Sequence, residues 1–291
     1  MRIDYRLSAD LFPYQPRWLD HNGTRVHYVD EGMGRPILFL HGNPTSSFLY
    51  RGIIARLKPH FRCVAVDYPG FGLSDRPESG YNYTPREHAE VVAALVTKLD
   101  LNDLIVMGQD WGGPIGIATA LQHQSRTSGL VFANTWYWPA EGATFNGFSL
   151  VMGSPPMQWL ILKRNFFVQR LIPAGTARPV PPEVMEVYRA LQPTPEARRG
   201  IAEFPKEIRR SREWLRVLAE RAPRELADRP MLVMWGHRDR AFGGQRVVRD
   251  RWRRDFPNAE VVDFPKASHY IQEDAPEELA EHIQRKFRTA V

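Results

Sequence analysis

The sequence has a single cysteine among its 291 residues and lacks any long apolar run. Cys63 therefore has no internal disulfide partner, which agrees with a reducing compartment, and its place in the apolar run FRCVAVDY predicts a buried, inert thiol. No segment approaches the ~18 apolar residues of a membrane helix. The first residues, MRIDYRLSADLFPY, lack the apolar core of a signal peptide. We expect a soluble, cytoplasmic protein with no membrane partner.

A strong excess of charge of one sign is also missing, because 39 basic residues face 33 acidic ones and leave a net charge of +6. The basic clusters RRSREWLR and RDRWRRDF are interrupted by acidic residues at helical spacing. This pattern favours solvated, partly paired helix faces over a nucleic-acid surface. Metal-ligand clusters, a Walker loop and a dinucleotide glycine fingerprint are absent from the sequence, so we expect neither metal nor cofactor.

Short apolar runs alternate with turns and helical patterns in the first part of the chain. A helix is predicted from a Thr84 cap, Pro85 in the first turn and apolar residues at helical spacing. Continuous apolar strands between such helices are typical of a parallel sheet covered on both faces, the α/β class. The expected strands lie in residues 24–32, 35–42, 61–68, 104–110 and 128–135.

The pattern changes between residues 135 and 222, where prolines, aromatic residues and helical spacing replace the strand-like runs. Strand and helix alternation returns at 229–239 and 259–269. We interpret residues 1–134 and 223–291 as one mostly parallel α/β core, and residues 135–222 as an inserted helical cap. Such an insertion is expected over the carboxyl ends of the strands, where α/β sheets bind ligands.

The segment VMGQDWGGPIG, residues 106–116, predicts a strand, a sharp glycine turn and a helix. This is the pattern of a nucleophile elbow, which holds a reactive side chain above the end of a sheet. Asp110 occupies the central position, Asp239 follows a later strand, and His269 lies near the end of the chain. Nucleophile, acid and histidine in this order are typical of α/β-hydrolases. We therefore expect the three side chains to meet.

A carboxylate at the elbow indicates a different reaction from that of a serine enzyme. Serine needs a base to remove its proton, whereas a carboxylate with an ordinary pKa of ~3.9 is already ionised at neutral pH. Asp110 can displace a leaving group from saturated carbon and form an ester. His269 would then activate water, with Asp239 orienting its ring, while backbone N–H groups of Asn43 and Trp111 hold the oxyanion.

The motifs HGNPTSSFLYR, DYPGFGLSDRP, GQDWGGPIG, WGHRDRAF and SHYIQEDAPEE together resemble the haloalkane dehalogenases. The similarity covers residues 20–133 and 225–289, and is weakest in the expected cap. It implies an α/β-hydrolase fold, an uncharged halogenated substrate, and halide and an alcohol as products. It also implies that Asp110 is the nucleophile and that Trp111 and Asn43 donate hydrogen bonds to the departing halide.

One motif departs from a major branch of that family, in which a Glu after the strand before the cap is the catalytic acid. The corresponding stretch here is VFANTWYW, with Asn134 near that place. The resemblance therefore implies that Asp239 supplies the acid, as in branches with an Asp–His–Asp triad and an Asn–Trp halide pair. Glu141 is a fallback in a proline-interrupted loop.

Rival functions use related residues. An epoxide hydrolase would share the triad and need cap tyrosines, for which Tyr137 and Tyr188 are candidates. A fluoroacetate dehalogenase would be expected to carry Arg in place of Trp111, and a serine esterase would need a hydroxyl at the elbow. A non-catalytic ligand receptor would tend to lose members of the triad, and this chain keeps all three.

Several other residues have structural explanations. We expect His41 to support its loop, His237 to lie in a turn, and Asp67 to support the DYPGFG turn. The aromatic residues of the expected cap are mostly packing residues by their frequency in cores, and some of them should line the pocket. They are Trp136, Tyr137, Trp138, Phe145, Phe148, Trp159, Phe166 and Phe167.

Overall fold

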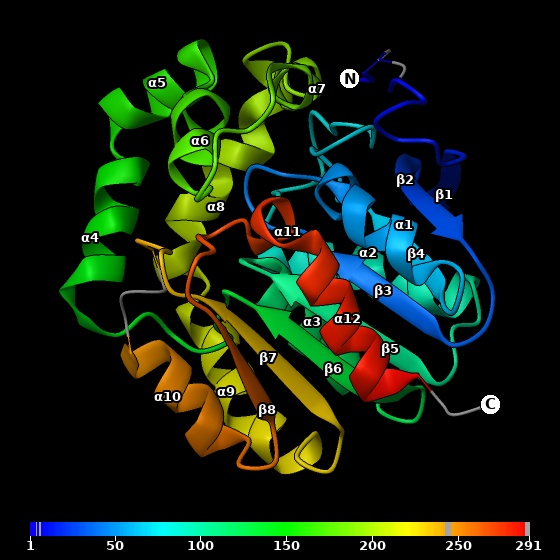
Figure 1. The fold of residues 1–291 in the computed structure, drawn as a ribbon. Coiled ribbons are helices and arrows are strands. Elements are labelled where there is room, and N and C mark those ends of the chain that lie inside the picture. Colours follow the sequence, from blue (N-terminus) through cyan, green and yellow to red (C-terminus); the bar gives the residue numbers. More distant parts are fainter. Residues whose placement is uncertain (4, 6, 242–245, 289–291) are drawn as a thin grey trace.

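A twisted sheet forms the centre of the computed structural model, which describes residues 1–3, 5, 7–241 and 246–288 (Figure 1). Its strands are β1 (Arg17–His21), β2 (Thr24–Glu31), β3 (Pro36–Leu40), β4 (Arg62–Val66), β5 (Leu104–Gln109), β6 (Thr127–Ala133), β7 (Met231–Gly236) and β8 (Glu260–Phe264). The spatial order is β1-β2-β4-β3-β5-β6-β7-β8. β2 runs antiparallel to β1 and β4, and the remaining neighbours are parallel. The predicted mostly parallel α/β sheet is confirmed.

The interior parallel strands are buried along all or nearly all of their length, as their continuous apolar sequences predict. Every residue of β3, β5 and β7 is buried. Strand β1 is the one that the sequence did not reveal. It lies at the sheet edge and buries only Leu19, so its hydrophobic pattern is too weak to indicate a strand.

Helices cover both faces of the sheet (Figure 1). On one face α1 packs against α12, and on the other α3 packs against α2 and α9. The predicted Thr84 cap is confirmed as a capping box with Glu87. These and the remaining core helices are η1 (Ser47–Tyr50), α1 (Arg51–Leu57), α2 (Pro85–Lys98), α3 (Gly112–Gln122), α9 (Arg212–Glu225), α10 (Arg246–Asp255), α11 (Ile271–Asp274) and α12 (Pro276–Phe287).

The chain between β6 and α9 forms a separate group of helices at one end of the sheet (Figure 1). These are α4 (Gly142–Gly153), α5 (Pro155–Arg164), the π-helical turn η2 (Phe167–Leu171), α6 (Ile172–Ala174), α7 (Pro182–Ala190), η3 (Glu196–Arg198) and α8 (Arg199–Arg210). We call this group the cap helices. The division of the chain at 134/135 and 222/223 stays a prediction, and α9 runs across the second of these points while packing against α3.

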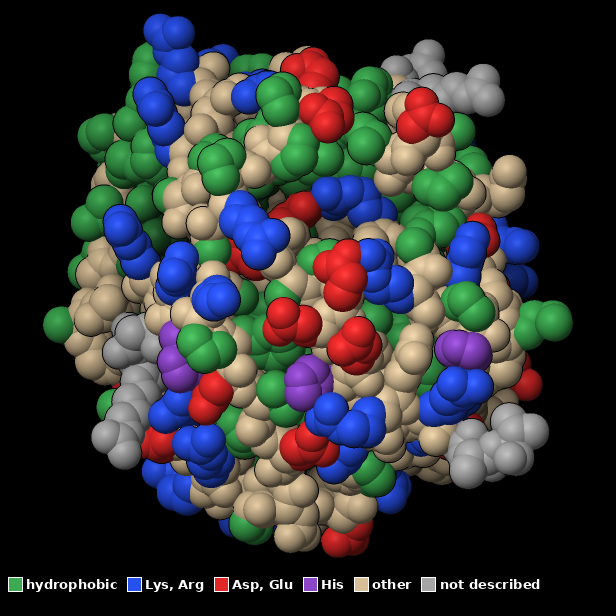
Figure 2. Space-filling model, viewed as in Figure 1, with side chains coloured by type: hydrophobic (Ala, Val, Ile, Leu, Met, Phe, Trp, Pro, Cys, Tyr) green, Lys and Arg blue, Asp and Glu red, His purple; other side chains and the backbone are tan. Residues whose placement is uncertain are grey.

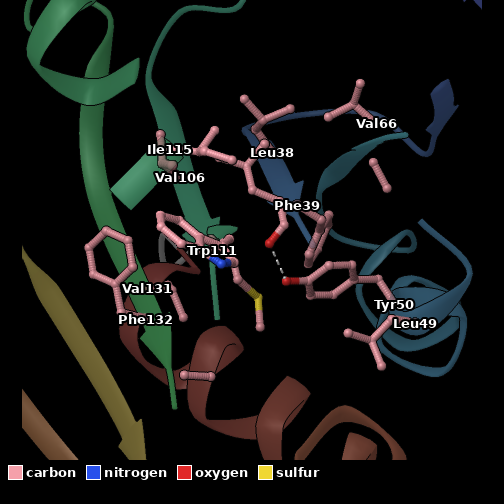
Figure 3. Close-up of a cluster of buried hydrophobic side chains, with 14 of the residues drawn as sticks. Leu38, Phe39, Leu49, Tyr50, Val66, Val106, Trp111, Ile115, Val131 and Phe132 are labelled. Carbon is pink, nitrogen blue, oxygen red and sulfur yellow. Dashed lines mark hydrogen bonds between the residues drawn. The ribbon is translucent and has the colours of Figure 1, made fainter. Parts of the chain in front are cut away.

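Buried side chains of β3, β5 and α3 pack together in the core near the elbow (Figure 3). Leu38 and Phe39 of β3 and Val106 of β5 pack in one buried cluster with Ile115 of α3. Nearby, the Tyr50 hydroxyl donates a 2.8 Å hydrogen bond to the carbonyl oxygen of Leu40, at the end of β3. β3 and β5 are paired directly in the sheet, and the Tyr50 hydrogen bond adds a side-chain contact at the carboxyl end of β3.

The surface agrees with the charge pattern of the sequence. Figure 2 shows basic and acidic side chains intermixed over the visible face. Within the two basic clusters, Arg216 pairs with Glu213 and Arg251 with Asp255, which confirms partly paired helix faces. Cys63 is buried as predicted, and burial raises the pKa of its thiol. In the described part of the chain no helix has both the length and the apolar character to cross a membrane.

Gly112, at the start of α3, has no space for a side chain, because a Cβ there would overlap the carbonyl oxygen of Leu40. We predict that Gly112→Ala lowers the free energy of unfolding by about 1–3 kcal/mol, the usual effect of overpacking. Gly147→Ala in α4 is the matched control, since its Cβ would meet nothing within 4 Å. The control should be neutral or stabilising by up to ~1 kcal/mol. Urea denaturation measures both, and equal effects would contradict the packing argument.

Candidate active site

The elbow places Asp110 between β5 and α3 in a left-handed backbone conformation, with φ of 53°. Its amide donates to the carbonyl oxygen of Asn134 (3.2 Å), and its carbonyl accepts from Gly113 N (3.0 Å). The turn also needs a close approach on its other side, because a Cβ on Gly42 would overlap the Asp110 side chain. This strained, close-packed elbow directs the carboxylate away from the sheet and toward the cap helices.

Backbone N–H groups hold the Asp110 carboxylate. The amide of Asn43 donates to Oδ1 at 2.9 Å, and the amide of Trp111 is a second donor. Burial raises the pKa of Asp110 above its usual value, and it outweighs the opposing effects of His269 and of these two donors. The carboxylate is therefore poorly solvated by water, and His269 and the two backbone donors offset only part of the cost of burying its charge.

His269 lies between the two aspartates. Its Nδ1 is 2.9 Å from Asp239 Oδ2, and its Nε2 is 3.7 Å from Asp110 Oδ2. Asp239 is buried after β7 and also accepts a 2.7 Å bond from the amide of Ala241. Burial lowers the pKa of His269, but the charge and hydrogen bond of Asp239, with a smaller effect of Asp110, raise it overall. The structure thus brings the three predicted residues together.

Asn134 follows β6 and links the loops that carry the other groups. Its Oδ1 accepts from the amide of Gly236 (2.7 Å), and its Nδ2 donates to the carbonyl oxygen of Ser268 (2.8 Å). It therefore connects the end of β7 to the loop of His269. Glu141 is exposed before α4, where it pairs with Arg251 at 2.5 Å, and it lies outside the described wall of the site.

A mostly apolar cavity of about 340 Å³ separates the aspartate–histidine group from the cap helices. Four of the predicted cap aromatics line it, namely Trp136, Phe145, Phe148 and Phe167. The other four lie outside its described wall; Tyr137, for example, donates to Asp255 at 2.7 Å, and Trp159 is exposed. The remaining wall consists of Asn43, Asp110, Trp111, Thr144, Leu171, Ala174, Gly175, Pro205, Ile208, Asp239, Arg240, Ala241, His269 and Tyr270.

The two predicted halide donors both line this cavity. Trp111 is held by aromatic packing, edge-on to Trp136 with ring centroids 4.9 Å apart and stacked on Phe204 at 5.2 Å. The Asn43 side chain donates through Nδ2 to the carbonyl oxygen of Ile201 in α8, at 3.1 Å. One of its amide hydrogens thus ties the core loop to the cap, and an amide group carries a second hydrogen.

The three residues expected to be structural have that role. His41 is fully buried, accepts from the amide of Tyr68 (3.3 Å), and stacks on that ring. His237 lies at the surface after β7 and contacts Asp263. Asp67 accepts a 2.9 Å bond from the amide of Leu73, which confirms its support of the glycine-rich turn.

Among the residues at the site that sequence reasoning missed, two contact predicted site residues directly. Gln109 precedes the elbow aspartate and contacts His269, and Tyr270 follows His269 and donates from its hydroxyl to the carbonyl oxygen of Asn43 (3.2 Å). Each is a direct chain neighbour of a predicted residue, and that adjacency was the available signal. Adjacency alone does not tell which neighbour faces the site, because this depends on the turn geometry.

The class of protein follows from a family match and from this geometry. The α/β hydrolase fold family matches residues 35–276, a range that contains the elbow, Asp239 and His269. The fold and the order of the site residues along the chain agree with that class.

Individual relatives narrow the class. "Haloalkane dehalogenase 2" of Mycobacterium tuberculosis is 50% identical over 287 residues, which cover 99% of this chain and 100% of the relative. The crystal structure of the haloalkane dehalogenase DatA from Agrobacterium tumefaciens has a TM-score of 0.83 and 26% identity, covering 93% of this chain and 95% of that one. A decarboxylase of cis-3-alkyl-4-alkyloxetan-2-one from Shewanella oneidensis is 32% identical over 284 residues, 94% of this chain and 88% of its own. The chain belongs to the haloalkane dehalogenase family, which confirms the resemblance inferred from its motifs.

The contact between His269 and Asp239 predicts how the pKa of His269 responds to substitution of Asp239. In the native protein the pKa of His269 should lie above its usual value, because the Asp239 charge outweighs burial. Asp239→Asn removes that charge and leaves the burial, so the pKa should fall. Glu141→Gln is the control and should leave it unchanged, because Glu141 pairs with Arg251 at the surface. Histidine NMR signals followed against pH measure this, and a fall in Glu141→Gln with none in Asp239→Asn would contradict the assignment.

Proposed function

We propose that the protein hydrolyses haloalkanes to an alcohol, a halide ion and a proton through a covalent ester on Asp110. The observation that carries the proposal is the way the Asp110 carboxylate is held. One oxygen, Oδ1, accepts from the backbone amide of Asn43. This leaves Oδ2 for bond formation at the wall of a mostly apolar cavity.

In the first step, Oδ2 of Asp110 attacks the carbon that bears the halogen. The new carbon–oxygen bond forms as the carbon–halogen bond breaks, and the halide leaves with the bonding electrons. Trp111 would donate its indole N–H to the halide, and the side-chain amide of Asn43 would be the second donor. Neutral donors stabilise the leaving charge without retaining it as a full positive charge would. The apolar wall keeps the attacking carboxylate poorly solvated, which favours attack on an uncharged substrate.

In the second step, His269 acts as the general base. Its Nε2 removes a proton from water, and the water oxygen attacks Cγ of Asp110. The negative charge on Oδ1 would be stabilised by the backbone amide of Asn43, which contacts this oxygen, and by the backbone amide of Trp111. Asp239 stabilises the cationic ring of His269. Breaking the bond between Cγ and Oδ2 releases the alcohol, which takes a proton from His269. The alcohol therefore carries the original enzyme oxygen, and Asp110 keeps that of water.

The epoxide hydrolase alternative receives less support. Such an enzyme needs tyrosine hydroxyls at the substrate, and the two candidates are engaged elsewhere. Tyr137 donates to Asp255, and Tyr188 donates to Glu273, which is bound to Arg51. Trp111 stands where a fluoroacetate dehalogenase is expected to carry Arg. A receptor without activity would not need a buried ion-paired histidine beside a strained aspartate.

A trapped intermediate tests the proposal. We predict that His269→Phe still forms the ester with 1-bromobutane but cannot hydrolyse it, so one equivalent of bromide is released and the Asp110 peptide gains one butyl group. Mass spectrometry measures the adduct. His237→Phe is the matched control, since His237 lies at the surface against Asp263, and it should turn over without an adduct. No adduct in folded His269→Phe would overturn the proposed mechanism.

A further inference from the structure

Gln109, the last residue of β5, is fully buried beside the proposed base. Its side-chain nitrogen lies 3.0 Å from His269 Nε2 and 3.1 Å from the carbonyl oxygen of the same residue. The amide thus contacts the ring atom that must remove a proton from water. The elbow motif assigns roles to Asp110 and Trp111 but none to Gln109, which precedes them.

The surroundings fix the orientation of the Gln109 amide. Exchanging its nitrogen and oxygen would bring Oε1 against the carbonyl oxygen of His269, two acceptors face to face. The nitrogen therefore faces the ring, and Nε2 of His269 accepts the hydrogen bond. A neutral imidazole that accepts at Nε2 carries its proton on Nδ1, where Asp239 Oδ2 lies at 2.9 Å. Gln109 and Asp239 select the same tautomer from opposite sides of the ring.

Retaining a polar side chain here has a cost. The Gln109 Oε1 atom is buried and has no hydrogen-bond partner among the described residues. A buried acceptor left in this way opposes folding. An apolar side chain would avoid that cost, so the contact of the amide nitrogen with His269 is a reason for glutamine at this position.

The charges around His269 make such a donor useful. Asp239 approaches from the loop after β7 and Asp110 from the elbow, and both favour the protonated ring. The Tyr270 ring packs edge-on to it at 4.7 Å, and Arg240 lies in the same cavity wall. A ring that is already protonated cannot act as a base. A donor directed at Nε2 stabilises the neutral ring and opposes Asp239, the carboxylate that remains beside the ring once Asp110 is an ester.

We propose that Gln109 is a positioning residue that keeps His269 unprotonated at Nε2 until this atom removes a proton from the attacking water. The inference rests on the proposed role of His269 as general base. When water occupies Nε2, the bond from Gln109 to the carbonyl oxygen of His269 keeps the amide in place. Gln109 thereby extends ester hydrolysis to lower pH, and it does so without contacting the substrate carbon.

Gln109→Met tests this, because it keeps the length of the side chain and removes the donor. Single-turnover hydrolysis of the preformed ester, followed against pH, should show its acid limb moved to higher pH by about one unit, the effect of one net hydrogen bond. Gln109→Glu should move it further, because a carboxylate favours the protonated ring. Gln192→Met is the matched control, a buried glutamine in the cap that should leave the limb unchanged.

Three results would overturn the inference. One is an acid limb at the same pH in folded Gln109→Met. Another is an acid limb that moves as far in Gln192→Met as in Gln109→Met. The third needs no variant: nitrogen NMR of the native protein showing neutral His269 protonated at Nε2. If His269→Phe also fails to accumulate the ester, the proposed function fails. If that ester accumulates while the acid limb of ester hydrolysis in Gln109→Met stays at the native pH, only the role of Gln109 fails.

Discussion

The buried negative charge of Asp110 is the constraint to which the rest of the site responds. Ionised carboxylates are strongly disfavoured away from water unless they are paired and hydrogen-bonded. Here the compensation comes from the backbone amides of Asn43 and Trp111 and from the nearby ring of His269. These groups keep the charge in place without surrounding it with water. In the proposed mechanism, a carboxylate in this state keeps its reactivity toward an uncharged carbon.

The parallel sheet explains how these groups meet. Asp110, Asp239 and His269 follow β5, β7 and β8, and the carboxyl ends of parallel strands lie at one edge of a sheet. Asn134 joins the loops after β7 and β8 through its two hydrogen bonds, so their spacing is set by a side chain as well as by the strands. The cap helices complete the cavity, and the Asn43 amide, bonded to α8, connects that cap to the core.

Much of this arrangement could be predicted from the sequence, because strand ends and glycine turns leave local patterns. The elbow at Asp110 and the strands before Asp239 and His269 are of this kind, and so is the loss of strand-like runs where the cap helices lie. The edge strand β1 was not predictable, since it buries one side chain. Which aromatics line the cavity also depends on how the cap helices pack, and Tyr137 and Trp138 pack instead around Trp252. The contact of Gln109 with His269 joins residues 160 positions apart, and no local pattern encodes it.

The most direct test of the account follows the oxygen of water through one turnover. With the enzyme in excess of 1-bromobutane in water enriched in heavy oxygen, the label should enter the carboxylate of Asp110, and the first butanol should be unlabelled. Mass spectrometry of the alcohol and of the Asp110 peptide measures both. Labelled alcohol from the first turnover, with an unlabelled Asp110 peptide, would contradict attack by Asp110 and indicate direct displacement by water.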